Sequence, residues 1–222
     1  MEMSLFETLS QHFKAQGFSL YMVGGTTRDF LLGRTCADWD LATDANPDEL
    51  QILLPEADMT FLRYGVARLK TSHGHIDITS FRVEGDYQDY RHPHHITFVR
   101  SWEEDAKRRD VTINALYRSA DGTILDAFHG QEDLKKKCLR MIGDPLIRFE
   151  EDPLRILRVL RFSLLLEFEI EKETECAMRK MVPLLEKLSK AKMQEEIRKM
   201  MAVHPRKTME ILQDYGIDKI VF

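Results

Sequence analysis

Two adjacent glycines, Gly24 and Gly25, follow the apolar run 20–23 and precede a stretch with helical character. Paired glycines let the backbone turn sharply and come close to a bulky group. A helix that begins at such a turn presents unpaired N–H groups and the positive end of its dipole to an anion. The stretch predicts a strand, a tight turn and a short helix that can bind phosphate, although a glycine pair alone can also be an ordinary turn.

Two acids, Asp38 and Asp40, stand two residues apart in the strand predicted after this helix. Residues i and i+2 of a strand point to the same face, so these carboxylates project together, as one or two Mg²⁺ ions require of oxygen ligands. Arg28, in the helix between, carries donors suited to phosphate oxygens. The combination suggests chemistry on a nucleoside triphosphate. The alternatives are two solvated acids and a simple pair between Arg28 and Asp29.

The charge of the chain is distributed unevenly. The net charge of −5 over 222 residues excludes a nonspecific nucleic-acid binder. Residues 1–60, however, hold 3 Lys and Arg against 10 Asp and Glu, whereas residues 135–161 hold 8 against 4. An acidic N-terminal region that binds metal and a basic segment further along the chain suit a polyanionic substrate.

The three cysteines are far apart and form no Cys-x-x-Cys pair, which indicates unlinked thiols in a reducing compartment. The amino terminus lacks a basic region followed by an apolar one, and no apolar run approaches membrane-spanning length. We therefore expect a cytoplasmic protein with no membrane contact.

Apolar spacing and turn residues divide the chain into a part with strands and a part with helices. Strands are expected at 20–23, 38–43, 75–82 and 96–99, with a hairpin over 115–126. Helices are expected at 4–15, 48–54, 102–108, 146–168, 172–187, 190–201 and 205–214. In the strand 75–82, Asp77 is a third candidate metal ligand, with a plain strand acid as the equal alternative.

The predicted helix 146–168 carries arginines at every third position, Arg155, Arg158 and Arg161, between apolar residues. A helix that is apolar around most of its circumference is largely buried, and buried guanidinium groups are costly unless they are paired. The acids at 150–152 neutralise part of this charge, and a triphosphate could supply the rest. Asp152 before Pro153 is also a common helix start, which is the alternative for this acid.

Several stretches carry a family resemblance. Gly-Gly-x-x-Arg-Asp-x-Leu-Leu-Gly-Arg at 24–34, with Asp-x-Asp-Leu-Ala-Thr at 38–43, resembles the first motif of the class II tRNA nucleotidyltransferases (CCA-adding enzymes) and the related bacterial poly(A) polymerases. Residues 108–116 resemble the second motif, with Val111 in place of Phe, and 151–155 resemble the Glu-Asp-x-x-Arg motif. Residues 87–93 resemble the flexible loop of the CCA-adding members, which disfavours an enzyme that adds only the two cytidines.

This resemblance implies an α/β (α+β) nucleotidyltransferase head with a mixed sheet over residues 1–143, followed by an all-helical neck over 144–222. It covers residues 18–170 and, loosely, 188–200, and we expect the body and tail domains of the family to be absent from this chain.

The resemblance also implies roles for individual residues. Asp38, Asp40 and Asp77 are the expected catalytic acids, and Asp38 and Asp40 the expected Mg²⁺ ligands. Asp152 and Arg155 are expected to select cytosine and adenine by their shared exocyclic amine. A base with a carbonyl there would leave a buried acceptor unpaired, at a cost of roughly 1–3 kcal/mol. The full set of expected nucleotide-binding residues is Gly24, Gly25, Arg28, Arg109, Asp110, Asp152, Arg155, Arg158 and Arg161.

The expected reaction is template-independent addition of CMP and AMP, from CTP and ATP, to the 3′ end of tRNA, with release of pyrophosphate. The alternatives are a poly(A) polymerase or a terminal adenylyltransferase that adds only A, and a catalytically silent tRNA-binding module.

Overall fold

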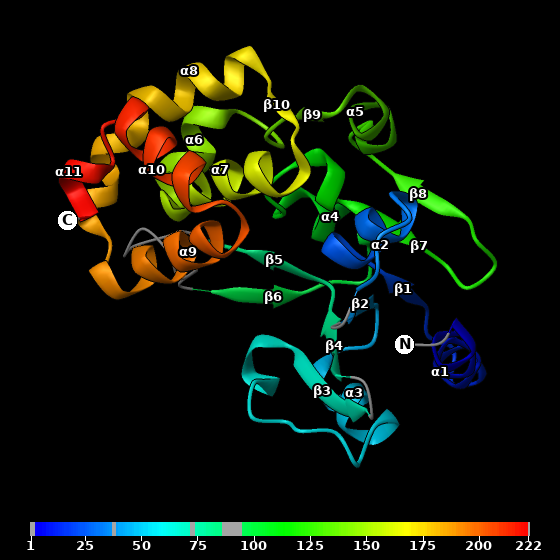
Figure 1. Cartoon of the computed structure of the whole chain (residues 1–222). Coiled ribbons are helices and arrows are strands. Elements are labelled where there is room, and N and C mark those ends of the chain that lie inside the picture. The colour runs from blue at the N-terminus through cyan, green and yellow to red at the C-terminus, as the bar shows by residue number, and fades with distance from the viewer. Residues whose placement is uncertain (1–2, 37–38, 72–73, 86–94, 222) are drawn as a thin grey trace. The chain divides into compact units, whose positions relative to one another are not determined.

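The computed structural model describes residues 3–36, 39–71, 74–85 and 95–221. Within these ranges the chain forms two compact units (Figure 1). The first comprises the described residues up to 85 together with 95–109 and 113–131, and the second comprises 110–112 and 132–221. The sequence-based boundary near residue 144 stays a prediction. Residues 87–93, which resemble the flexible loop of the family, lie outside the described residues.

The first unit is built on a mixed sheet. Among the described residues, six strands form it in the order β3-β4-β2-β1-β7-β8. β2 and β4 are parallel and the other neighbours antiparallel, which confirms the expected mixed sheet. Its strands are β1 (Leu20–Met22), β2 (Trp39–Thr43), β3 (Val66–Thr71), β4 (Gly74–Ser80), β7 (Leu116–Arg118) and β8 (Ile124–Asp126).

The other elements of this unit lie around the sheet (Figure 1). β5 (Arg82–Glu84) and β6 (Ile96–Phe98) form a separate antiparallel pair. The helices are α1 (Met3–Ala15), α2 (Gly24–Leu31), α3 (Pro47–Leu53), α4 (Trp102–Lys107) and the 3-10 turn η1 (Leu62–Tyr64). η2 (Thr112–Asn114) and α5 (Gly130–Lys136) contain residues of both units.

The core of the first unit follows from the sequence periodicity. Phe6 and Phe13 of α1 are fully buried, and the ring of Phe6 meets Trp39 edge-on at 6.4 Å. In β4, Ile76 and Ile78 are buried while the alternate residues His75, Asp77 and Thr79 are half-buried, so the predicted alternation is confirmed. This alternation fixes which face of the sheet carries the candidate acids.

The second unit is helical except for one short strand pair. β9 (Cys138–Leu139) and β10 (Glu169–Ile170) pair in parallel, and neither was expected from the sequence. The helices are α6 (Pro145–Glu151), α7 (Leu154–Leu166), α8 (Lys172–Met181), α9 (Lys190–Val203), α10 (Pro205–Asp214), α11 (Asp218–Val221) and the 3-10 helix η3 (Val182–Lys187). Among the described residues, no helix has the length and apolar character needed to cross a membrane.

The single helix predicted over 146–168 is wrong. α6 ends at Glu151 and α7 begins at Leu154, with Asp152 between them in an extended conformation at φ −143° and ψ 93°. Proline has no N–H for the helical ladder, and it disfavours helical geometry in the residue before it. Pro153 therefore separates the two helices.

Candidate active site

The glycine turn lies against the strand that carries Asp40. The N–H of Val23 donates to the carbonyl of Asp40 at 3.0 Å, and α2 begins at Gly24 with φ +59°. A Cβ on Gly24 would lie 3.4 Å from Nη1 of Arg109 and 3.9 Å from Oδ2 of Asp40. The missing side chain therefore leaves Arg109 and Asp40 facing the same point of the backbone. Gly25, the next residue of α2, is half-buried.

Asp40 and Asp77 lie on one face of the sheet. They are register partners on the parallel strands β2 and β4, so their side chains project side by side. Asp40 is exposed and Asp77 half-buried. Asp38 lies outside the described residues. Within the part of the chain that is described, no group of three His, Cys, Asp or Glu side chains is arranged as a metal site.

The donors of this pair suit a hard divalent cation. Carboxylate oxygens are the ligands that Mg²⁺ prefers, and Asp40 and Asp77 supply them from adjacent strands. Both oxygens of Asp77 accept from Arg68, from Nε at 2.6 Å and Nη2 at 2.7 Å. A cation that binds Asp77 has to compete with this arginine.

Arg28 is directed into the protein. Its Nε and Nη2 each donate to Asp29 at 2.9 Å, and its Nη1 donates to Asn114 at 2.8 Å. The side chain is only 5% exposed. The pair with Asp29, the alternative from the sequence, is present, and Asn114 ties α2 to the segment before β7. A direct phosphate contact of Arg28 stays a prediction.

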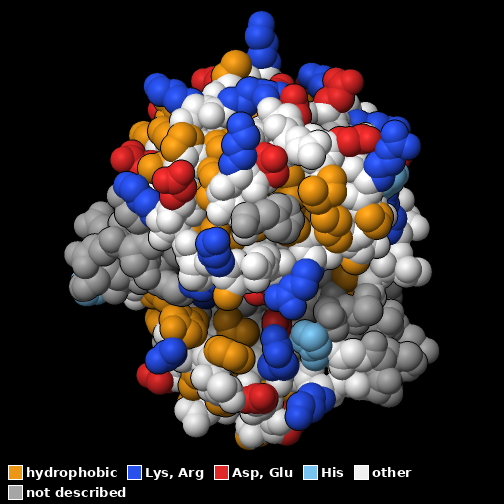
Figure 2. All heavy atoms as spheres, turned by 60° about the vertical axis from the view of Figure 1, so that its left-hand side comes forward, with side chains coloured by type: hydrophobic (Ala, Val, Ile, Leu, Met, Phe, Trp, Pro, Cys, Tyr) orange, Lys and Arg blue, Asp and Glu red, His pale blue; other side chains and the backbone are white. Residues whose placement is uncertain are grey.

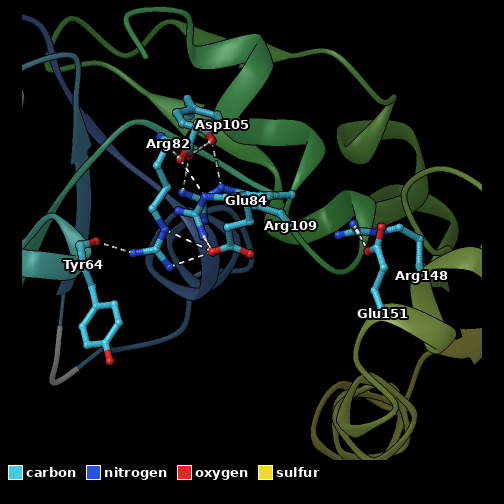
Figure 3. Close-up of polar contacts among 9 residues, drawn as sticks. Tyr64, Arg82, Glu84, Asp105, Arg109, Arg148 and Glu151 are labelled. Atoms are coloured by element: carbon cyan, nitrogen blue, oxygen red, sulfur yellow. Dashed lines mark hydrogen bonds and ion pairs between the residues drawn. The ribbon is translucent and has the colours of Figure 1, made fainter. Parts of the chain in front are cut away.

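Arg109 belongs to a buried polar cluster that the sequence did not reveal (Figure 3). Its Nε donates to the hydroxyl of Tyr117 at 2.8 Å, and its Nη2 donates to Asp105 at 3.2 Å. The Tyr117 hydroxyl in turn donates to Asp105. Burial raises the pKa of Asp105, but the charges of Arg108 and Arg109 outweigh it and lower this pKa to about 2. Asp105 is therefore ionised throughout the neutral range.

The cluster continues to the β5–β6 pair (Figure 3). Arg82 donates from Nη2 to Glu84 at 2.8 Å and from Nη1 to the carbonyl of Tyr64 at 2.5 Å. Arg108 donates to Asp105 at 2.8 Å and contacts Glu84 at 3.3 Å. Burial is the main cause of a lowered pKa for Arg82. Asp105 lies in α4 and Arg109 just beyond its end, and their separation of four residues could have indicated the pairing. The partners from β5 and β7 could not be found from local spacing.

In the second unit, each arginine of α7 has an acidic partner. Arg155 donates to Glu151 at 2.8 Å, whereas Arg158 donates to Asp110 at 2.6 Å and 3.0 Å. Asp110 also accepts from the N–H of Val111. Among the acids at 150–152, Glu151 pairs with Arg155 as expected, whereas Arg158 pairs with an acid distant in the sequence. The share of a triphosphate in the neutralisation stays a prediction.

Arg161 has the most buried of these partners. It donates to Glu196 of α9 at 2.7 Å, with the Glu196 side chain 5% exposed. This pair ties α7 to α9 within the unit, so Arg161 has a structural role of its own. Asp110, Arg158 and Arg161 stay predictions as nucleotide contacts.

Asp152 lies at the break between α6 and α7. Its Oδ1 accepts from the N–H of Leu154 at 3.0 Å, and the side chain is half-buried. Asp152 thus accepts an N–H at the start of α7, as the helix-start alternative expects, but Pro153 is the N-cap residue. Nearby, Arg148 pairs with Glu151 at 2.5 Å (Figure 3), and Arg155 also donates to the Arg148 carbonyl at 2.8 Å. Base selection by Asp152 and Arg155 stays a prediction.

The basic segment 135–161 does not form a uniformly basic surface. All five of its arginines, Arg140, Arg148, Arg155, Arg158 and Arg161, are paired with acids. Figure 2 shows Lys and Arg side chains interspersed with Asp and Glu on the face that it presents. The positive charge of this segment is therefore largely neutralised by ion pairs within the fold.

Two family models match the chain. Residues 20–140 match the model described as Poly A polymerase head domain. Residues 167–222 match the model described as Probable RNA and SrmB-binding site of polymerase A.

Relatives and solved structures agree with these matches. The CCA-adding enzyme of Lactobacillus helveticus (strain DPC 4571) is 43% identical over 206 residues, which are 92% of this chain and 52% of the relative. The structure of the Bacillus stearothermophilus CCA-adding enzyme in complex with CTP superposes with a TM-score of 0.85 at 33% identity, covering 96% of this chain and 52% of that one. The Thermotoga maritima CCA-adding enzyme complexed with tRNA_CCA gives 0.81 at 26% identity, covering 99% and 52%. The chain thus spans about half the length of the curated relatives it matches.

Proposed function

This chain belongs to the poly A polymerase head domain family, and on that premise we propose that it adds CMP and AMP, from CTP and ATP, to the 3′ end of tRNA. Pyrophosphate is the second product, and no nucleic-acid template is used. The observation that carries the proposal is the placement of Asp40 and Asp77 on one face of the sheet, with Arg109 beside the glycine turn. The named relative and both solved structures are CCA-adding enzymes, which supports the same substrates.

We assign the acids of the sheet to the metal. Asp38, Asp40 and Asp77 would hold Mg²⁺ through carboxylate oxygens, with Arg68 displaced from Asp77. Bound there, Mg²⁺ would supply Lewis-acid stabilisation of the attacking and leaving oxygens. The family as a whole points to a divalent cation, and the hard oxygen donors favour Mg²⁺ among them.

The glycine turn and Arg109 are assigned to the triphosphate. The backbone at Gly24 and Gly25 admits the phosphates closely, and the N–H groups at the start of α2 can donate to them. The Arg109 guanidinium balances their negative charge, so that the α-phosphate is held for in-line attack by the RNA 3′-hydroxyl.

In the second unit, Asp152 and Arg155 are assigned to base selection. A carboxylate accepts from the exocyclic amine that cytosine and adenine share, and a guanidinium donates to ring acceptors. Arg158 and Arg161 support this role, because their pairs with Asp110 and Glu196 hold α7 in place.

The decisive experiment offers the purified chain, Mg²⁺ and single labelled nucleotides to tRNAs that end before, within and after CCA. We expect CMP and then AMP to be incorporated, UMP and GMP to be rejected, and Asp40→Asn to abolish the reaction. Long tails from ATP alone would favour a poly(A) polymerase instead. A chain that binds tRNA but incorporates no nucleotide would favour the silent binding module.

We also propose a location for the protein. Cys36, Cys138 and Cys176 are not joined in disulfides. Unlinked cysteines are typical of reducing compartments, so we place the protein in the cytoplasm.

A further inference from the structure

Tyr117 and Asp105 hold the guanidinium of Arg109 at two of its three nitrogen atoms. Tyr117 and Asp105 are both fully buried. The Tyr117 oxygen accepts from Nε of Arg109, and Asp105 accepts from Nη2. The guanidinium also lies over the Tyr117 ring, with its central carbon 4.9 Å from the ring centroid. Because the guanidinium is planar, contacts at Nε and Nη2 fix the direction of Nη1.

That direction leads to the glycine turn. Nη1 is the atom that a Cβ on Gly24 would meet at 3.4 Å, and Asp40 Oδ2 lies 3.9 Å from the same point. We propose that Tyr117 and Asp105 are positioning residues for triphosphate binding, which hold Arg109 with Nη1 turned toward the glycine turn beside Asp40. This inference rests on the proposed function, because it specifies how that site binds the phosphates.

The electrostatics of the cluster support this role. Asp105 lies between the two cations Arg108 and Arg109 and also accepts the backbone N–H of Arg82 at 3.1 Å. A carboxylate with this many donors stays ionised and rigid. Burial raises the pKa of the Tyr117 phenol, and together with Asp105 it outweighs the opposing charge of Arg109, so the proton stays on the oxygen at neutral pH. Asp105 and Tyr117, which hold Arg109, therefore keep their protonation states at neutral pH.

A purely structural role is the competing explanation. The Tyr117 ring packs against Tyr21, Phe81 and Trp102, at centroid distances of 6.2, 6.0 and 5.5 Å. Loss of this packing would lower the amount of folded protein. Tyr117→Phe keeps the ring and removes only the hydroxyl, so it separates the two explanations.

The test measures CTP and ATP binding to the full 222-residue chain with Mg²⁺ by titration calorimetry, together with KM and kcat for CMP addition. We expect Tyr117→Phe to raise the Kd and KM for both nucleotides by about tenfold, the loss that follows from one hydrogen bond to a charged group. The factor should be equal for CTP and ATP, because Arg109 is assigned to the triphosphate. A structural defect would instead lower kcat through the fraction of active molecules and leave Kd and KM unchanged.

Asp105→Asn and Arg109→Gln complete the design. Asp105→Asn should raise the Kd further than Tyr117→Phe, because it removes the charge that holds Nη2. In an Arg109→Gln background, Tyr117→Phe should add little to the loss, since both changes remove one interaction. Full additivity of the two losses would overturn the inference.

Tyr215 provides a matched control in the other unit. Its hydroxyl donates to Glu175 at 3.2 Å, and Arg179 lies over its ring at 4.1 Å, so a tyrosine, an arginine and an acid meet here as well. Tyr215→Phe should leave the nucleotide Kd unchanged. A wild-type chain that neither binds CTP nor incorporates it would refute the proposed function and the inference with it. A wild-type chain that binds CTP no better than Tyr117→Phe would refute the inference alone.

Discussion

Under the proposed function, Arg68 would compete with a divalent cation for the carboxylate of Asp77. The two-nitrogen pair between Arg68 and Asp77 is partly solvated, with side chains 36% and 23% exposed. Such a pair contributes at most about 1 kcal/mol, even with favourable bidentate geometry. A cation that uses Asp77 must overcome this energy, because the arginine holds both oxygens.

Arg68→Gln should therefore bind Mg²⁺ more tightly and be less stable without it. Removing a competitor worth about 1 kcal/mol corresponds to an increase in affinity of roughly fivefold. The same change leaves Asp77 beside Asp40 with less neutralising charge, so we expect the free energy of unfolding without metal to fall by about 1 kcal/mol. Mg²⁺ should then restore more stability to the variant than to the wild type.

The assay is a Mg²⁺ titration followed by calorimetry and by urea denaturation, at constant ionic strength. Arg63→Gln is the matched control, since it removes the same charge from an arginine over the ring of Tyr64. Unchanged Mg²⁺ affinity in both Arg68→Gln and Asp77→Asn would show that Asp77 is not a metal ligand. Weaker Mg²⁺ binding by Arg68→Gln would show that Arg68 orients Asp77 rather than competing for it.

Two further predictions concern the turn and the neck. Gly24→Ala, at φ +59°, should lower the free energy of unfolding by about 1–2 kcal/mol and weaken CTP binding by at least about tenfold in titration calorimetry. Gly17 has φ +85°, and a Cβ built there would have no atom within 4 Å, so Gly17→Ala should lower only the stability in urea. Arg161→Met should lower the free energy of unfolding by about 2–3 kcal/mol, somewhat less than breaking a fully buried pair, because Lys199 still contacts Glu196 at 3.1 Å. Burial raises the Glu196 pKa, but Arg161 outweighs it and lowers the pKa below 4.5. The stability gained from this pair is therefore present above pH 4.5 and lost as the pH falls. The difference in unfolding free energy between wild type and Arg161→Met, measured in urea, should shrink below that pH.

Local sequence patterns were sufficient for the elements that carry the site. The apolar run before Gly24, the glycine pair and the periodicity of the following helix describe contacts between near neighbours, and the structure confirms the strand, turn and helix. The alternation in β4 was predictable for the same reason. The break at Pro153 is also local, but helical spacing on both sides of it made one long helix look continuous.

The sequence alone determined which chemical groups are the candidates for binding a nucleotide: the glycine turn, the strand acids and the arginines along a buried helix. The tertiary structure decided the partners that are distant in the sequence. Asp40 meets Asp77 only because β2 and β4 are parallel and in register, and Asn114 reaches Arg28 across 86 positions of the chain. Such pairings are set by packing between distant segments, and no local spacing encodes them.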